Sequence, residues 1–247
     1  MWMRTYKVRS VSLQMTRAPR RELSAEKLFE RYYGAPTSVL HFQQAIAVMT
    51  SSNTKVDFLH VTEGRYHFDS ESLAEGKALL LTTKARAIQN ILQQNYNTAR
   101  KNVGSLLHTL QDFYSHSNWV ELGFQKPLRN LLRADESIGR IAGPDERTCS
   151  ECVTSHSCRD KILDNVLNQK ILTTGYFGFS SNARPEGKCS HGGSADRGKR
   201  ANQGINKDTR KSPHGQYHNT AAEIATQASL ELFLEIWDTV GDDSFLR

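Results

Sequence analysis

The sequence predicts an all-α fold, a multi-helix bundle interrupted by one long irregular segment. Apolar residues recur at the three- and four-residue spacing of amphipathic helices through much of the chain. No stretch alternates apolar and polar residues over a length that would indicate a strand. Between residues 173 and 213, seven glycines and almost no apolar period predict a loop of unusual length.

The two earliest helices are predicted over residues 24–33 and 37–52. The second has Thr37 or Ser38 as its cap, and its apolar face is formed by Val39, Phe42, Ile46 and Met49. A longer helix, opened by Ser70 or Ser72, is expected to continue to Gln94, with Leu73, Leu80, Ala87 and Ile91 at helical spacing.

Four more helices are predicted after residue 94. The helix over 98–119 has Leu106, Leu110 and Phe113 on its core face. A weaker pattern covers 128–141, and a short one covers 161–171. The last helix, over 218–239, has a side rich in small and branched apolar residues, from Ala221 to Ile236, that is expected to join the core.

A chain of 247 residues is long enough to bury one sizeable core. Its hydrophobic fraction of 38% and mean hydropathy of -0.57 are low, which indicates that part of the length is loop. We expect a basic, disordered or atypical N-terminal segment over 1–34. A single helical domain over 35–247 would follow, with a loop-rich insertion at about 142–213.

The net charge of +6 is concentrated in two places. Eight basic residues stand against three acidic ones before Gly34, and the same balance occurs between residues 184 and 211. Both segments read as loop and lack interleaved aromatic residues, so a nucleic-acid partner is not favoured. No run approaches the length of a transmembrane helix, and the first residues lack the apolar region of a signal peptide.

Four cysteines fall at positions 149, 152, 158 and 189. Two disulfides are one interpretation; the other is a structural zinc site in which His156 or His191 completes the ligand set. The second Cys-x-x-Cys pair that would favour zinc is lacking, so we favour disulfides. Disulfides imply an oxidising compartment, and with no signal peptide in this chain we expect that a preceding part of the protein is missing.

The most informative motif places His108, Asp112 and His116 at four-residue intervals in the helix predicted over 98–119. Residues so spaced share one helix face. A hydrogen-bonded polar seam is the plain alternative. His108 and His116 would lie about 12 Å apart along the axis. One ion with bonds of about 2 Å would not hold both, which favours two ions bridged by Asp112.

Two further candidates lie elsewhere. His67 and Asp69 stand just before the helix that begins near Ser72, where a surface turn is the alternative. His214 and His218 flank the start of the last helix and are expected to close the cluster from the opposite side. The other histidines, His191 among them, have no partner at ligand spacing and are predicted to be structural.

The stretch from Leu107 to Glu121, LHTLQDFYSHSNWVE, resembles the signature of the fungal heterokaryon-incompatibility Het-C proteins. It is closer to the N-terminal region of the von Willebrand factor A domain-containing protein 7 family. Further matching stretches are 66–69, 172–177, 187–193, 204–208 and 240–246. The resemblance covers about residues 37 to 247. It implies an extracellular protein whose von Willebrand A domain would follow residue 247, so this would be a partial chain.

That family is similar in turn to the zinc-dependent phospholipase C and single-strand nuclease fold, an all-helical bundle with three zinc ions. The similarity implies that His108 and Asp112 form its His-x-x-x-Asp pair, with Asp112 bridging. Zinc-bound hydroxide would attack a phosphodiester. The resemblance and the motifs together predict His67, Asp69, His108, Asp112, His116 and His218 as ligands of two or three zinc ions.

The sequence departs from those enzymes in three ways. Their next histidine follows the aspartate by six residues, whereas His116 follows Asp112 by four; Ala222 replaces the acid four residues after His218; and the N-terminal ligands have no counterpart. We therefore favour a non-catalytic interaction or structural module that keeps a partial metal site, with an unidentified protein or phospholipid partner. The alternative is a zinc-dependent phosphodiester or phospholipid hydrolase, whose catalytic residues the sequence does not identify.

Overall fold

The structure, a computed structural model, describes residues 24, 26–28, 30, 34, 38–150, 161–178, 184–193, 196 and 203–246. Within these ranges the chain forms helices and loops, with isolated β-bridges and no β-strand. The α-helices are α3 (Leu40–Leu59), α4 (Gly64–His67), α5 (Leu73–Leu92), α6 (Tyr96–His116), α7 (Asp164–Asn168), α8 (His218–Val240) and α9 (Asp242–Phe245). The all-α prediction is confirmed. The predicted N-terminal segment and the helix over 24–33 lie mostly outside the described residues.

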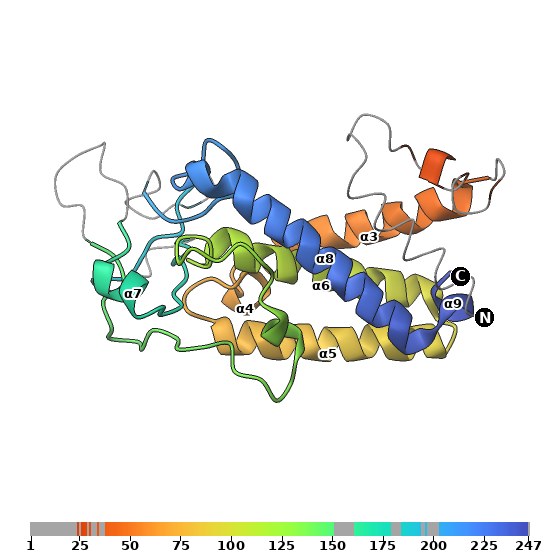
Figure 1. Cartoon of the computed structure of the whole chain (residues 1–247), viewed down its shortest axis with the longest axis horizontal. Helices are drawn as coiled ribbons and strands as arrows, with labels where there is room; N and C mark the ends of the chain where they lie inside the picture. Colours follow the sequence, from red (N-terminus) through yellow and green to blue (C-terminus); the bar gives the residue numbers. More distant parts are fainter. Residues whose placement is uncertain are drawn as a thin grey trace.

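Helix α6 is the centre of the bundle, and α3, α5 and α8 pack around it (Figure 1). Its predicted core face is confirmed, because Leu106, Leu110 and Phe113 are all buried. Leu80 of α5 and Leu232 of α8 belong to the same apolar cluster. Burial of this surface is the main force that holds the four long helices together. None of the helices in the described part of the chain is long and apolar enough to cross a bilayer.

Helix α3 is longer than predicted and is capped differently. Val39 stands at its N-cap position and makes no side-chain cap bond, but the hydroxyl of Ser38, one of the two predicted caps, accepts a bond from the Leu40 amide at 3.5 Å. Thr37, the other, lies outside the described residues. The helix crosses α6 closely at Gly104, where an added Cβ would overlap the carbonyl oxygen of Met49. This close approach places Asp57, near the end of α3, beside the polar face of α6.

The prediction of a helix over 128–141 is wrong, because only a 3₁₀ turn, η2 (Arg129–Leu132), forms there. Its periodic apolar residues Leu131, Leu132 and Ile138 are buried, but they anchor a loop to the bundle. The helix predicted over 161–171 is reduced to the five residues of α7. In both segments the regularly spaced apolar residues are points where a loop contacts a core. They do not form the apolar face of a long helix.

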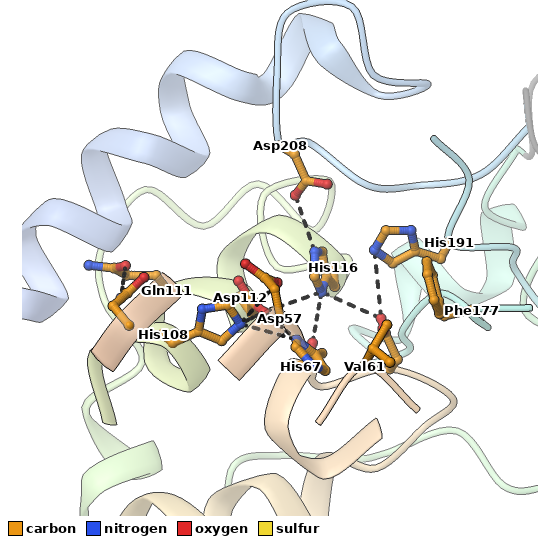
Figure 2. A pocket seen from close by; sticks show the side chains of 12 residues that line it. Asp57, Val61, His67, His108, Gln111, Asp112, His116, Phe177, His191 and Asp208 are labelled. Carbon is orange, nitrogen blue, oxygen red and sulfur yellow. Dashed lines mark hydrogen bonds and ion pairs between the residues drawn. The ribbon is translucent and has the colours of Figure 1, made fainter. Parts of the chain in front are cut away.

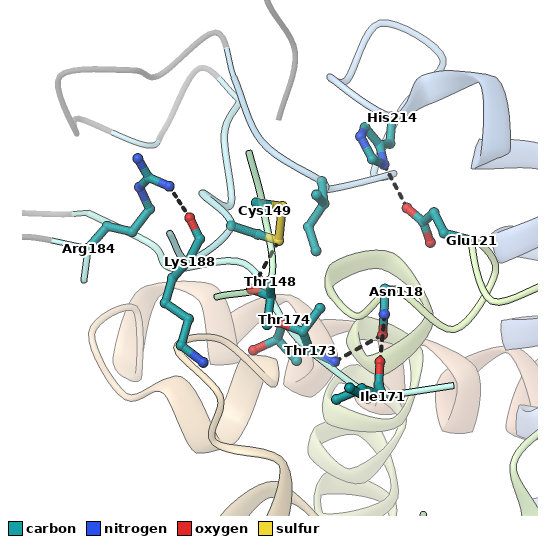
Figure 3. Close-up of a disulfide and its surroundings, with 12 residues drawn as sticks. Asn118, Glu121, Thr148, Cys149, Ile171, Thr173, Thr174, Arg184, Lys188 and His214 are labelled. Atoms are coloured by element: carbon teal, nitrogen blue, oxygen red, sulfur yellow. Dashed lines mark hydrogen bonds and ion pairs between the residues drawn. A yellow bond between two sulfur atoms is a disulfide. The ribbon is translucent and has the colours of Figure 1, made fainter. Parts of the chain in front are cut away.

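The loop-rich segment gathers around a second, smaller apolar cluster at one end of the bundle, away from α9 (Figure 1). A disulfide joins Cys149 to Cys189 at its centre, and both residues are fully buried (Figure 3). The expectation of disulfides is confirmed for this pair, which excludes both sulfurs as zinc ligands. Cys152, Cys158 and His156 lie outside the described residues.

Candidate metal centre

A cavity of about 480 Å³ lies where α3, α4 and α6 meet the loop-rich segment (Figure 2). Amide and apolar side chains, including Gln111 and Phe177, form part of its wall. Most of its lining is four imidazoles and four carboxylates. These belong to His67, His108, His116 and His191, and to Asp57, Asp69, Asp112 and Asp208.

The predicted stripe on α6 faces this cavity. Oδ2 of Asp112 lies 3.0 Å from Nε2 of His108 and 4.0 Å from Nδ1 of His116. Asp112 therefore stands between the two histidines. His67 and Asp69, predicted from the turn before α5, also line the cavity.

His218 does not reach the cavity. It is the first residue of α8, and its Nδ1 lies 2.7 Å from the carbonyl oxygen of Lys207. Its predicted partner His214 is buried and bonds Glu121 at 2.7 Å. The structure thus brings together five of the six predicted ligands and gives His218 a different neighbour.

One group of donors is compact. Nδ1 of His67, Nε2 of His108 and Oδ2 of Asp112 are separated by 3.0, 3.0 and 3.1 Å. Ligand atoms of a tetrahedral zinc ion with bonds of about 2.0 Å lie about 3.3 Å apart. Asp57 stands at the edge of this group, with its Oδ1 3.6 Å from Nε2 of His108. The spacing of these donor atoms therefore fits a single transition-metal ion.

The hydrogen bonds around His67 sharpen this fit. Its Nε2 lies 3.2 Å from the carbonyl oxygen of His60, which can only accept, so this nitrogen donates, and Nδ1 is the atom whose lone pair a bound cation would take. That lone pair faces the carboxylate of Asp112 and Nε2 of His108. A cation bound by the three atoms would remove the repulsion between their lone pairs.

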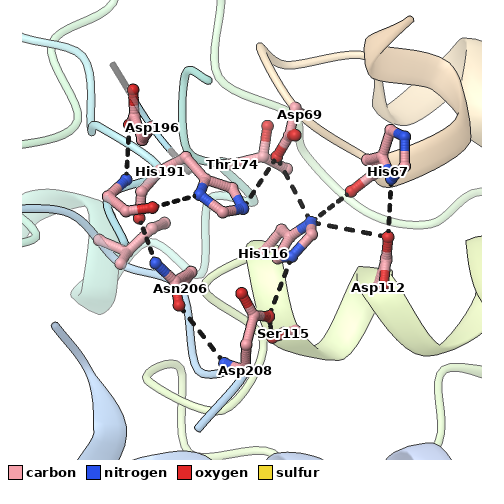
Figure 4. Close-up of polar contacts among 12 residues, drawn as sticks. His67, Asp69, Asp112, Ser115, His116, Thr174, His191, Asp196, Asn206 and Asp208 are labelled. Atoms are coloured by element: carbon pink, nitrogen blue, oxygen red, sulfur yellow. Dashed lines mark hydrogen bonds and ion pairs between the residues drawn. The ribbon is translucent and has the colours of Figure 1, made fainter. Parts of the chain in front are cut away.

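A second group is formed by Asp69, His116 and His191, whose donor atoms lie within 4.8 Å of one another (Figure 4). Nδ1 of His191 donates to the carbonyl oxygen of Gly192 at 2.6 Å, which leaves Nε2 facing Asp69 at 3.9 Å. Oδ1 of Asp69 is buried without a hydrogen-bond partner. Asp208 adds a carboxylate oxygen 3.1 Å from Nε2 of His116.

The turn that carries Asp69 is conformationally strained. Phe68, Ser70 and Glu71 have φ angles of 55°, 54° and 60°, in the left-handed region that residues other than glycine rarely adopt. The loop at residues 174–175 holds the turn through two bonds of 2.8 Å, one from the Ser70 amide to Gly175 and one from the Glu71 amide to Thr174. Strain of this kind costs about 1 to 3 kcal/mol per residue and is typical of functional sites.

The surroundings of the cavity raise the pKa of one lining carboxyl, Asp69, and lower the pKa values of Asp112 and His191. Burial and the neighbouring carboxylates, among them Asp112, raise the pKa of Asp69 well above its usual range. Burial would raise the pKa of Asp112 too, but the charge of His116 and hydrogen bonds from two histidines lower it below its usual range. Burial and the charge of His116 lower the pKa of His191 to about 4, so this imidazole is neutral at physiological pH.

Three lining residues are not predicted from the sequence. His191 and Asp208 have no acidic or histidine partner at helical spacing, and Asp57 has only His60, which does not line the cavity. The three residues reach the cavity from α3 and two loops. One signal was available for two of them. His191 and Asp208 fall within the stretches 187–193 and 204–208 that carry the family resemblance.

Comparison with known proteins agrees with that resemblance. The family model of the VWA7 N-terminal domain matches residues 23–246. The chain is 38% identical to von Willebrand factor A domain-containing protein 7 of Mus musculus and of Homo sapiens, over 92% of its own length. The match spans 26% of each of those relatives. No solved structure matches the chain. The chain belongs to the VWA7 N-terminal domain family.

Proposed function

We propose that this domain binds two divalent transition-metal ions of the zinc class in the cavity of Figure 2. The triangle of donor atoms from His67, His108 and Asp112 is the observation that carries the proposal. The distances between its three atoms match the spacing of zinc ligands. The His67 ring is oriented by its bond to the backbone, and the His108 ring by its place on α6. The first ion would bind there with Asp57, and the second at Asp69, His116 and His191.

Ions in these positions would connect parts of the chain that are far apart in sequence. The first position joins α3, α4 and α6, and the second joins α6 to the loop that carries His191. Metal binding of this kind contributes directly to the stability of a fold. We therefore infer a structural and interaction role for the domain, as the N-terminal module of a VWA7-like protein. The buried disulfide supports an extracellular setting.

One observation favours a second function, zinc-dependent hydrolysis of phosphodiesters or phospholipids. The cavity is large enough for a small ligand, and the side chain of Asp57 at its rim is 60% exposed. An ion reached by solvent can activate water. Zinc-loaded protein that cleaves bis(4-nitrophenyl) phosphate or phosphatidylcholine vesicles, and loses this activity in Asp112→Asn, would establish the hydrolase. No turnover with either substrate would remove it.

Metal binding is tested by titrating metal-free protein with Co²⁺, because imidazole and carboxylate ligands give visible absorption bands whose intensity reports coordination geometry. The unaltered chain should show two saturable steps. Asp112→Asn should lose both, since its carboxylate contacts both groups. His41→Gln is the matched control, because His41 is an exposed imidazole of α3 outside the cavity lining. Equal titrations of all three proteins would contradict the proposal.

A further inference from the structure

Lys207 is a lysine whose side chain is completely buried. Its ammonium has three protons, and three oxygens lie within hydrogen-bond distance. They are the carbonyl of Ser117 at 2.9 Å, the carbonyl of Ile205 at 2.7 Å and Oε1 of Glu121 at 2.9 Å. Every donor of this cation is therefore used: two acceptors lie in the segment that directly follows α6, and the third lies in the loop that carries Lys207 itself.

The main chain of Lys207 is fastened at the same place. Its amide donates to the carbonyl oxygen of Ser115 at 3.1 Å, and its carbonyl oxygen accepts a bond from Nδ1 of His218 at 2.7 Å. Ser115 and Ser117 flank His116, the last residue of α6. The segment that contains Lys207 is thus attached on both sides of His116.

The next residue along the chain is Asp208, which faces the cavity. Its Oδ1 lies 3.1 Å from Nε2 of His116 and also accepts a bond from the Ser115 hydroxyl (Figure 4). Unlike Lys207, the Asp208 side chain is 46% exposed and has little packing of its own to fix it. Its place beside His116 depends on the segment that carries it.

Glu121 is the counter-charge of Lys207 and is itself almost completely buried. Its Oε1 also accepts a bond from Nδ1 of His214 at 2.7 Å (Figure 3), while Oε2 is buried without a hydrogen-bond partner. A buried ion pair adds little stability compared with apolar side chains of the same size, because both charges lose their hydration. A gain in stability therefore does not account for the Lys207–Glu121 pair. A requirement to fix the position of the segment around Lys207 does account for it.

We infer that Lys207, held by Glu121, is a positioning residue that keeps Asp208 against His116 and so completes the second ion position. The inference rests on the proposed metal binding. It also gives His218 a role different from the predicted one: His218 bonds the carbonyl oxygen of the positioning residue and lies outside the cavity lining.

The test compares Lys207→Met, which keeps side-chain length without charge, with Lys84→Met. Lys84 is a matched control because its ammonium also bonds a carboxylate, Glu235 at 2.7 Å, and a carbonyl, Leu132 at 2.8 Å, none of which lines the cavity. In Lys207→Met, zinc titration against a competing chelator should show a second ion weakened about 10- to 100-fold and an unchanged first ion. Amide exchange of metal-free protein should show faster exchange at residues 205–208, relative to the control.

Each outcome decides a separate claim. A folded Lys207→Met that keeps both the second-ion affinity and the slow exchange at 205–208 would overturn the positioning role alone. An unaltered chain that binds no zinc would overturn the proposed function and the ion-related role with it. If Lys207→Met does not fold, Glu121→Gln provides the same comparison, since it removes the counter-charge and keeps the volume and one acceptor oxygen.

Discussion

Nδ1 of His67 lies 3.0 Å from Oδ2 of Asp112, although 45 positions separate the two residues in sequence. The opposite nitrogen of His67 is turned to the carbonyl oxygen of His60. A neutral ring held in this way directs a lone pair at a carboxylate, which is favourable when a cation lies between them. The same arrangement recurs at His191, whose Nδ1 is fixed by Gly192 and whose Nε2 faces Asp69.

Because the two groups use different histidines, their ions can be removed separately. We expect His191→Ala to bind one zinc ion fewer per chain and to keep the ion at His67 and His108. His67→Ala should lose that ion, because its ring supplies a corner of the compact triangle. Elemental analysis after dialysis at a fixed free zinc concentration measures both. Loss of both ions in His191→Ala would show that the positions are not independent.

The disulfide should support the second position. Cys189 is two residues from His191, and its bond to Cys149 closes a loop with a sequence separation of 40. Removing the bond in the double variant Cys149→Ala, Cys189→Ala should lower the free energy of unfolding by roughly 4 kcal/mol, through the entropy of the unfolded chain. Urea denaturation checks this magnitude. We also expect weaker binding of the second ion, and a variant with unchanged stability and both ions would refute the link.

Glu121 should make the stability of the metal-free chain depend on pH. Burial would raise the pKa of its carboxyl, but the charge of Lys207 and the hydrogen bond from His214 hold it below the usual value. A lowered folded-state pKa means that the carboxylate stabilises the fold above the unfolded pKa of about 4.3, and that this contribution is lost as the pH falls through the folded value.

Unfolding by urea at a series of pH values isolates this effect. The stability difference between the unaltered chain and Glu121→Gln should be greatest near neutral pH and should shrink as the pH falls below about 4.3. A difference that stays constant, or grows toward acid, would contradict a stabilising carboxylate at this position.

Gly104 sets the distance between α3 and α6, and therefore the reach of Asp57. Gly104→Ala should destabilise the fold by about 1 to 3 kcal/mol, because the added Cβ overlaps the backbone of Met49 and forces the two helices apart. Gly143→Ala is the control, since a Cβ there meets Glu146 only at 3.9 Å. Thermal denaturation of both variants measures the difference. Equal stability of the two would mean that α3 adjusts without strain.

The sequence predicted the fold class and the central part of the site for the same physical reason. His108, Asp112 and His116 lie on one helix, so their spacing fixes their common face. The apolar residues of α5, α6 and α8 likewise repeat at the helical period. Spacing of this kind is a local property of the sequence, so it can be read without any knowledge of the tertiary structure.

The remaining members of the site depend on contacts between distant segments. His191 and Asp208 lie in loops whose paths are set by a disulfide, a buried lysine and glycines, and no local period marks them. His218 was predicted from its place at a helix start, but its Nδ1 bonds the carbonyl oxygen of Lys207 and its side chain does not line the cavity. The pattern over 128–141 failed because loop anchors can share the spacing of a helix face.

The number of zinc ions bound per chain tests the central claim most directly. Purified protein, dialysed against a low and buffered concentration of free zinc, is measured by elemental analysis beside Asp112→Ala and His41→Gln. We expect two ions in the unaltered chain and in His41→Gln, and none in Asp112→Ala, because the Asp112 carboxylate contacts both groups of ligands. An unaltered chain that holds no zinc would contradict the assignment of the cavity as a metal centre.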